Sequence, residues 1–308
     1  MTSSLAKWGV PDVKGLCDRF EEALGGRYRV TSDPQCLTAH EDDRHGGRSD
    51  DARRARDLQR ALRDDRVHAV VAVAGGAWFT RILRRIDFGV LRRRRTRLWV
   101  LGMSEMTPLI NIAACHRQAV GIYDAVVKLV LDRVRSPRAA KAQLEVLLED
   151  MGRMIAGEET FRSLRGTWIS GKRPDRSPVR IVGGNLTLIA AMMGGPYARA
   201  FDTRAGWLAV EDVNEKPERI DRMLAQLRLA GLFDRIEGVL LGDFHRDRDD
   251  LHDAVVELLR FHLPSRRIPV VGRCNFGHVW PVAPLPIRRP LRLWRQGDVV
   301  HLTWDDPL

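Results

Sequence analysis

The sequence contains no apolar run that approaches the roughly 20 residues needed to cross a bilayer. Its N-terminal stretch also lacks the apolar core of about 7–15 residues that a secretory signal peptide requires. Aromatic residues make up only 6% of the chain, and they do not interleave with basic residues as in a platform for single-stranded nucleic acid. We therefore expect a globular protein that stays in the cytoplasm.

Cysteine is scarce, and its spacing argues against cysteine-based sites. The four cysteines, Cys17, Cys36, Cys115 and Cys274, are widely separated, and none belongs to a C-x-x-C pair. This spacing fits neither a zinc site nor a disulfide framework. We expect buried free thiols and no metal.

Two common functional fingerprints are missing as well. Gly183-Gly184-Asn185 has a superficial likeness to a phosphate-cradling turn, but it has neither G-x-G-x-x-G spacing nor a following lysine with serine or threonine. The G-x-S-x-G elbow is incomplete, because Gly102 and Ser104 match while Met106 replaces the second glycine. These motifs therefore indicate neither nucleotide binding nor an α/β-hydrolase.

Basic residues, by contrast, are abundant. The chain has 51 lysines and arginines against 40 acidic residues, a net charge of +11. We expect a solvated, arginine-rich surface and no nucleic-acid partner, because the basic residues are scattered rather than gathered on one helix face. An anionic substrate or an anionic polymer would also fit this charge.

The 308 residues, 44% of them hydrophobic, are enough for two domains. Residues 1–130 alternate short apolar runs with amphipathic segments, which is typical of a parallel α/β sheet. We expect a first domain over residues 1–150, a polar linker over 151–178 and a second domain over 179–308.

The periodicity of the sequence predicts individual elements. Helices are expected at Val13–Leu24, Asp51–Arg63, Trp78–Ile86, Thr107–Cys115, Pro137–Ile155, Leu186–Met193 and Leu251–Phe261. Strands are expected at Arg27–Thr31, His68–Ala74, Arg97–Leu101, Val179–Val182 and Ile268–Val271, with a loop over His40–Asp51 and a closing hairpin over Leu291–Trp304.

The most regular stretch is Gly206–Phe244. Two short apolar runs flank an amphipathic segment that begins near Pro217 and stops at Gly231, as helices commonly do. This pattern predicts a β-α-β unit in a parallel sheet. Ligands bind beyond the carboxyl ends of such strands, and Glu211 occupies one of these ends.

Three residues at predicted strand ends make up the set that a serine hydrolase needs. Ser104 would supply a hydroxyl nucleophile, His278 a base that takes its proton, and Glu211 a carboxylate that fixes the histidine tautomer. Each also has a simpler interpretation: a helix N-cap, a structural histidine and an exposed turn acid, respectively. Asp212 and Glu215 compete with Glu211 for the acid role, and spacing alone does not choose among them.

The order of five motifs resembles the LD-carboxypeptidases, a family of serine peptidases. The motifs are Gly75-Gly76, Gly102-Met103-Ser104-Glu105-Met106-Thr107, Gly183-Gly184-Asn185-Leu186-Thr187, Glu211-Asp212-Val213-Asn214-Glu215 and Gly277-His278. The likeness extends from about Val30 to Leu285, and Glu211–Leu232 is its most specific part.

The resemblance implies an α/β enzyme with a Rossmann-like parallel-sheet domain, a second α/β domain rich in β-strands, and an active site at their interface. It implies that Ser104 is the nucleophile, His278 the general base and Glu211 the orienting acid. The backbone N–H groups of Glu105 and Gly76 would form the oxyanion hole. It further implies a homodimer without metal or organic cofactor.

The usual reaction of the family removes the terminal D-alanine from a cytoplasmic muropeptide by cutting an L,D amide bond, which serves cell-wall recycling. Two alternatives stay open. The same mechanism could detoxify a peptide-nucleotide antibiotic, or the chain could be a non-catalytic relative that binds an anionic partner.

Four features depart from the family pattern. Glu105 follows the nucleophile where the family has aspartate, and Ala77-Trp78 follows the glycine turn in place of Tyr-Gly, with Trp78 close to the expected substrate path. Gly121-Ile122-Tyr123-Asp124-Ala125 stands in place of the family's His-Gly-Pro stretch. The first apolar strand of the family is missing or reduced to Ser3–Val10.

Overall fold

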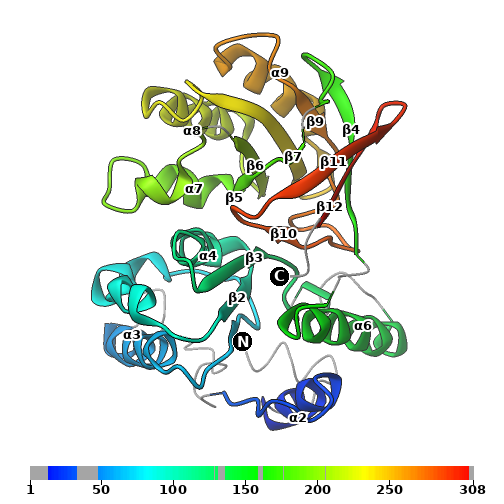
Figure 1. Ribbon diagram of the computed structural model, residues 1–308. Helices are drawn as coiled ribbons and strands as arrows, with labels where there is room; N and C mark the ends of the chain where they lie inside the picture. The colour runs from blue at the N-terminus through cyan, green and yellow to red at the C-terminus, as the bar shows by residue number, and fades with distance from the viewer. Residues whose placement is uncertain are drawn as a thin grey trace.

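The computed structural model describes residues 13–32, 48–127, 129–130, 136–158, 162–175, 177–204 and 206–304. Within these ranges the chain forms two lobes, each built on its own sheet (Figure 1). The reduced strand considered at Ser3–Val10 lies outside the described residues, as does most of the loop expected at His40–Asp51. The end of that predicted loop is helical from Arg48 onward.

The first lobe contains a four-stranded, mostly parallel sheet. Its strands are β1 (Ala69–Val71), β2 (Leu98–Gly102), β3 (Ala119–Tyr123) and β10 (Leu285–Pro286), in that spatial order. The first three are parallel, and β10 joins β3 in the antiparallel sense. β2 and β3 are buried along their whole length, so their sequences read as continuous apolar runs. The predicted parallel sheet is confirmed.

The helices of the first lobe surround this sheet. They are α2 (Val13–Ala23), α3 (Arg48–Arg63), η3 (Thr80–Arg85), η4 (Phe88–Arg93), η5 (Ser104–Met106), α4 (Thr107–Ala114) and α6 (Pro137–Ile155). α6 has the predicted bounds: Ser136 is its N-cap, and Pro137 occupies the first turn, where a missing N–H is tolerated. α4 packs on β2 and β3 and faces the second lobe (Figure 1).

The second lobe contains a larger mixed sheet. Its strands are β4 (Leu164–Ser170), β5 (Ile181–Asn185), β6 (Gly206–Val213), β7 (Ile236–Arg246), β8 (Asp249–Asp250), β9 (Val270–Gly272), β11 (Leu291–Gln296) and β12 (Val299–Trp304). The spatial order is β11-β12-β4-β9-β7-β6-β5, and β8 pairs with β7. The run from β5 to β9 is parallel, whereas β4, β12 and β11 add antiparallel pairs. This lobe is α/β and rich in strands, as the resemblance implied.

Helices α7 (Leu186–Met192), η6 (Ala198–Phe201), α8 (Pro217–Leu229) and α9 (His252–His262) complete the second lobe. The predicted β-α-β unit is confirmed as β6-α8-β7, whose two strands are parallel. Pro217 is the first residue of α8. Gly231 has a φ of 78°, which an L side chain rarely adopts, and it follows the helix as the predicted stop.

The structure differs from the sequence prediction at two elements. The expected linker 151–178 contains β4, an interior strand of the second sheet. The glycine at Gly166 hides its alternation: a Cβ there would lie 2.5 Å from Cys274 Sγ, so this buried position carries no apolar side chain. The expected strand Arg27–Thr31 is not a strand, because the Val30 N–H donates to Glu21 Oε1 at 2.7 Å rather than to a neighbouring strand.

Smaller corrections concern a helix and the thiols. The helix expected at Trp78–Ile86 is a short 3-10 helix over Thr80–Arg85. The three cysteines that the structure describes are all free thiols. Only Cys274 among them is buried as expected, whereas Cys17 is half-buried and Cys115 is exposed. No helix in the described ranges is both long and apolar enough to span a bilayer.

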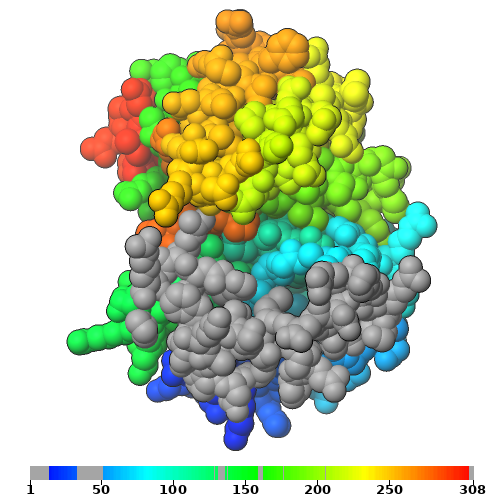
Figure 2. Space-filling model, turned by 180° about the vertical axis from the view of Figure 1, so that it is seen from behind, coloured from blue at the N-terminus to red at the C-terminus, as the bar shows by residue number. Residues whose placement is uncertain are grey.

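The two lobes share one continuous apolar core. β10, from the C-terminal part of the chain, completes the first sheet. The Asn111 amide on α4 binds both backbone groups of Gly183 on β5, donating to its carbonyl at 2.8 Å and accepting from its N–H at 3.1 Å. Seen from behind, the yellow and orange surface of the second lobe rests on the cyan surface of the first (Figure 2). Residues from both lobes can therefore be held at fixed positions in one site.

Candidate active site

Ser104 lies on a sharp turn between β2 and α4. Its φ is 57°, in the left-handed region that costs a non-glycine residue about 1–3 kcal/mol. The turn containing Gly75 crosses close over it: a Cβ on Gly75 would lie 2.7 Å from Ser104 Cβ and 3.1 Å from its Oγ. Glycine is therefore required at position 75, and the strained backbone presents the Ser104 side chain at the end of β2.

Glu105 anchors the neighbouring loop. Its side chain is buried, and its Oε1 accepts a hydrogen bond from the Thr80 N–H at 3.1 Å. Burial raises the pKa of Glu105, and hydrogen bonds from Thr80 and Phe79 oppose this shift only in part. Gly76, with a φ of 103°, lies in the loop that Glu105 fixes. Glu105 and Gly76, the two residues predicted to supply oxyanion N–H groups, thus lie on neighbouring segments that the Glu105–Thr80 hydrogen bond joins.

Glu211 lies in β6, which runs on to Val213, three residues beyond the apolar run Trp207–Val210 that predicts the strand. The pairing with β7 shifts register between Val210 and Asp212, an irregularity of the kind that re-aims side chains near active sites. Glu211 is fully buried. Among Glu211, Asp212 and Glu215, it is the one whose carboxylate contacts His278.

The Glu211 carboxylate has three partners. Its Oε2 lies 2.6 Å from His278 Nδ1, and its Oε1 accepts from Tyr123 Oη at 2.6 Å and from Asn185 Nδ2 at 3.3 Å. Burial raises the pKa of Glu211, but the positive charge of His278 and these hydrogen bonds outweigh it, so the pKa lies below its usual value. Glu211 is therefore an ionised carboxylate beside the imidazole.

His278 is held against Glu211 by Gly277. The φ of Gly277 is 100°, and a Cβ there would lie 2.8 Å from Glu211 Cγ, so only glycine permits this approach. Burial lowers the pKa of His278, but the charge of Glu211 and its hydrogen bond, helped by Asp212 and Asp243, raise it above its usual value. The predicted acid–histidine pair is present.

Tyr123 was not predicted as a site residue. The Ser104 backbone N–H donates to Tyr123 Oη at 2.8 Å, and Tyr123 in turn donates to Glu211. Burial and the nearby Glu211 charge hold the pKa of Tyr123 well above its ordinary value, so its hydroxyl keeps the proton that it donates. A tyrosine at the carboxyl end of a fully buried strand, where a phenol needs a partner, is the signal that could have found it.

Hydrogen bonds therefore connect the three predicted triad residues, but they do not run in the order serine, histidine, acid. Glu211 binds His278 directly and reaches the Ser104 backbone through Tyr123. Across the described part of the chain, no hydrogen bond links Ser104 Oγ to His278. Hydrogen bonds of this kind tighten in enzymes when substrate binds.

The two competing acids, Asp212 and Glu215, form contacts that hold neighbouring elements in place. Asp212 accepts from the Thr187 N–H at 2.8 Å and from its Oγ1 at 2.7 Å, which fastens the start of α7. Burial and the charge of Glu211 raise the pKa of Asp212 to about 6. Glu215 pairs instead with Arg219 on α8 at 3.0 Å. Asp212 and Glu215 therefore fasten neighbouring elements, whereas Glu211 contacts the imidazole of His278.

A hollow of about 600 Å³ opens beside the pair. Its lining includes Asp243, His245, Arg248, Arg273, His278 and Trp280. Arg273 is already paired with Asp250 at 2.8 Å, whereas the exposed Arg248 has no ion pair with any described residue. A ligand in this hollow would contact the imidazole of His278 and the unpaired guanidinium of Arg248.

Comparison with known proteins agrees with this arrangement. The family model for the LD-carboxypeptidase N-terminal domain matches residues 2–124, and the model for the C-terminal domain matches residues 179–293. The chain belongs to the LD-carboxypeptidase family. This is a family of serine hydrolases, and both matched regions contribute to the site described above.

Individual relatives support the same assignment. A putative carboxypeptidase of Streptomyces coelicolor is 32% identical over 83% of this LD-carboxypeptidase chain and 78% of its own. A probable murein peptide carboxypeptidase of Bacillus subtilis is 29% identical over 77% and 72%, respectively. The crystal structure of muramoyltetrapeptide carboxypeptidase from Oxalobacter formigenes superposes with a TM-score of 0.66, at 26% identity and 95% coverage of both chains.

Tyr123 gives a first prediction for this LD-carboxypeptidase. Tyr123→Phe removes the hydroxyl that accepts from Ser104 N–H and donates to Glu211, so the Ser104 N–H loses this acceptor and the Glu211 carboxylate loses one of its donors. We expect kcat to fall by about 10- to 100-fold with little change in KM, because the lost bonds position the reacting groups. Steady-state kinetics of the Tyr123 variant and the wild type measures this change.

Tyr197→Phe is the matched control, since Tyr197 Oη donates only to the Leu83 carbonyl. Equal kinetics for the Tyr123 variant and wild type would contradict the positioning role.

Proposed function

We propose that this enzyme is a serine carboxypeptidase that cuts the L,D amide bond of a murein tetrapeptide and releases the terminal D-alanine. The observation that supports this most directly is the buried Glu211–His278 pair, coupled through Tyr123 to the backbone of Ser104. Relatives named as murein peptide and murein tetrapeptide carboxypeptidases support the substrate class.

In the first half of the reaction, Ser104 Oγ attacks the carbonyl carbon of the scissile amide. His278 Nε2 takes the hydroxyl proton, while Glu211 holds Nδ1–H and stabilises the imidazolium that forms. The N–H groups of Glu105 and Gly76 stabilise the oxyanion, as the resemblance implied. His278 then gives its proton to the leaving amine, so D-alanine departs and an acyl-enzyme on Ser104 remains.

In the second half, water replaces the amine. His278 takes a proton from the water, whose oxygen attacks the acyl carbon, and returns that proton to Ser104 Oγ as the ester bond breaks. The shortened peptide leaves with a new carboxylate, and the enzyme returns to its starting state.

A carboxypeptidase must also recognise the terminal carboxylate of its substrate. Of the two arginines in the hollow beside His278, Arg273 is paired with Asp250, so Arg248 is the guanidinium available to a new anion. Arginine binds carboxylates through paired N–H donors, which favours this geometry. We assign Arg248 to the D-alanine carboxylate.

The proposed function is tested by measuring the amino acid released from two tetrapeptides that differ only in whether the last residue is D-alanine or L-alanine. We expect the enzyme to release D-alanine and to leave the L-alanine peptide largely intact. Equal release from both peptides would argue against an L,D-specific enzyme. No release from either peptide would argue against a murein-peptide substrate.

Arg248 gives a second prediction. Arg248→Gln should raise KM for the tetrapeptide by about 10-fold and leave kcat within about twofold, because a charge-assisted hydrogen bond contributes about 1.5–3 kcal/mol. Kinetics with Arg228→Gln, an equal change of charge on the exposed face of α8, provides the control. A parallel rise in both variants would show that only the overall charge matters.

A further inference from the structure

The positive charge of the chain is concentrated in one sequence region. Residues 48–97 contain fifteen arginines and six aspartates, with no lysine and no glutamate, so they carry nine of the eleven excess positive charges. This stretch comprises α3, η3 and η4, and α3 packs against both 3-10 helices. Basic residues occur along the whole chain, as expected, but most of the net positive charge belongs to this part of the first lobe.

Most of the aspartates in this region are already neutralised. Five of the six form ion pairs within it: Asp51 with Arg54 and Arg81, Asp57 with Arg60, Asp64 with Arg66, Asp65 with Arg95, and Asp87 with Arg93. Arg94 is buried and donates to five backbone carbonyls. The remaining exposed arginines therefore have few local acids to bind.

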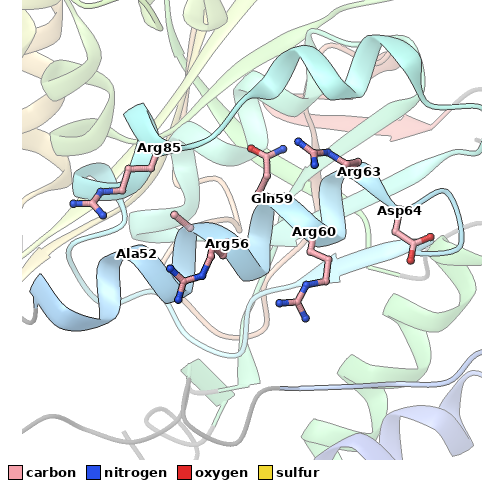
Figure 3. Close-up of a pocket in the computed structure, with 8 residues that line it drawn as sticks. Ala52, Arg56, Gln59, Arg60, Arg63, Asp64 and Arg85 are labelled. Carbon is pink, nitrogen blue, oxygen red and sulfur yellow. The ribbon is translucent and has the colours of Figure 1, made fainter.

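Several of these arginines surround one hollow, of about 740 Å³, between α3 and η3. Arg56, Arg60 and Arg63 lie at helical spacing on one face of α3, and Arg85 reaches the hollow from η3 (Figure 3). Arg56, Arg63 and Arg85 are exposed and form no ion pair with any residue in the described ranges. Two separate elements thus contribute unpaired guanidinium groups to the same cavity.

The other lining groups do not cancel this charge. Ala52 and Ala55 are small, and Asp64 is held by Arg66 through Oδ2 at 2.8 Å. The Gln59 amide is also engaged, since it donates to the Asp87 carbonyl at 3.2 Å and accepts from the Asp87 N–H at 2.6 Å. That double hydrogen bond fixes the loop between η3 and η4 to α3, so the hollow has a rigid wall.

We propose that this hollow is a binding site for a compact oligophosphate, contacted by Arg56, Arg63 and Arg85. Guanidinium groups match phosphate oxygens through paired donors, and several phosphates in one ligand would satisfy cations from both elements. The hollow shares no lining residue with the one beside His278, so the ligand would bind away from the active site. The same phosphate chemistry is offered by a free oligophosphate and by the backbone of a nucleic acid.

Titration calorimetry of the full chain with inorganic tripolyphosphate at about 0.15 M ionic strength tests the proposal. We expect saturable binding of one tripolyphosphate per chain, weakened by about tenfold or more in the double variant Arg56→Gln/Arg63→Gln. The matched control is Arg222→Gln/Arg228→Gln, which removes the same charge from the exposed face of α8 and should bind like wild type. Release of D-alanine should be unchanged in both double variants, which separates this site from the proposed reaction.

A competing short DNA duplex distinguishes the two sources of phosphate. Failure of the duplex to displace tripolyphosphate would assign the site to a free oligophosphate. Displacement that also depends on Arg56 and Arg63 would assign the phosphates to a nucleic-acid backbone. Absence of saturable tripolyphosphate binding to the wild type, or equal weakening in both double variants, would overturn the proposal.

Discussion

Replacing Ser104 with alanine should lower kcat for D-alanine release by at least about ten-thousandfold, because the substitution removes the only atom proposed to bond to the substrate carbonyl. The variant should fold normally. The contact of Ser104 with Tyr123 uses the backbone N–H, which alanine keeps, and the left-handed φ of 57° is no worse for alanine than for serine.

Activity and folding are measured separately in this experiment. A serine-directed covalent probe should label the wild type and not the variant, and the melting temperatures of the two should agree. Ser136→Ala is the matched control: it loses the N-cap of α6, which should lower stability by about 1 kcal/mol and leave kcat unchanged. Retained turnover in the Ser104 variant would reject the nucleophile assignment.

The parts of the site that sequence could predict are those set by local pattern. Glu211 and Ser104 each follow an apolar run that became a buried strand, and both belong to motifs of the family. Spacing alone does not choose among Glu211, Asp212 and Glu215, because the choice depends on the register shift with β7 beside Glu211, whose carboxylate contacts His278. A pairing irregularity between distant strands leaves no local mark in the sequence.

Contacts between distant segments account for the other differences. Tyr123 and Glu211 are 88 residues apart and meet only when the two sheets pack together. β4 was hidden because Gly166 replaces a core side chain where Cys274 approaches closely. Counting charges along residues 48–97 locates the arginine excess in the sequence, but only the fold shows that α3 contacts both η3 and η4. Composition alone could report the charge but not its location.

The pKa of His278 links the site geometry to pH. Catalysis needs neutral His278, so kcat/KM should fall as pH drops below its pKa. That pKa is raised above 6.5, so we expect the acid limb of the profile above pH 6.5.

The raised pKa of His278 also affects the stability of the fold. His278 contributes its full stabilisation below pH 6.5, and this contribution is lost as pH rises through the folded pKa. Glu211, with a lowered pKa, has the opposite sign: its contribution holds above pH 4.5 and is lost as pH falls through its folded pKa.

Replacing Glu211 with glutamine tests this link and the acid assignment together. Glutamine can present an N–H to His278 Nδ1, which would favour the tautomer with its proton on Nε2, and such a histidine cannot accept the Ser104 proton. The corresponding change in a serine peptidase triad lowers kcat by about ten-thousandfold, and we expect an effect of that order here. The Tyr123 hydrogen bond to the side-chain oxygen can persist, so the fold should survive.

The pH profile of this variant provides a readout that a purely structural role would not change. With the Glu211 charge removed, burial is the dominant influence on His278, and burial lowers its pKa. The residual activity should therefore show an acid limb below pH 6.5, shifted opposite to the wild type. Glu257→Gln, which neutralises an exposed acid paired with Arg260 on α9, should change neither kcat nor the limb. An acid limb that stays in place in Glu211→Gln would mean that another group controls the protonation of His278, and Glu211 would then lose its proposed role as the orienting acid.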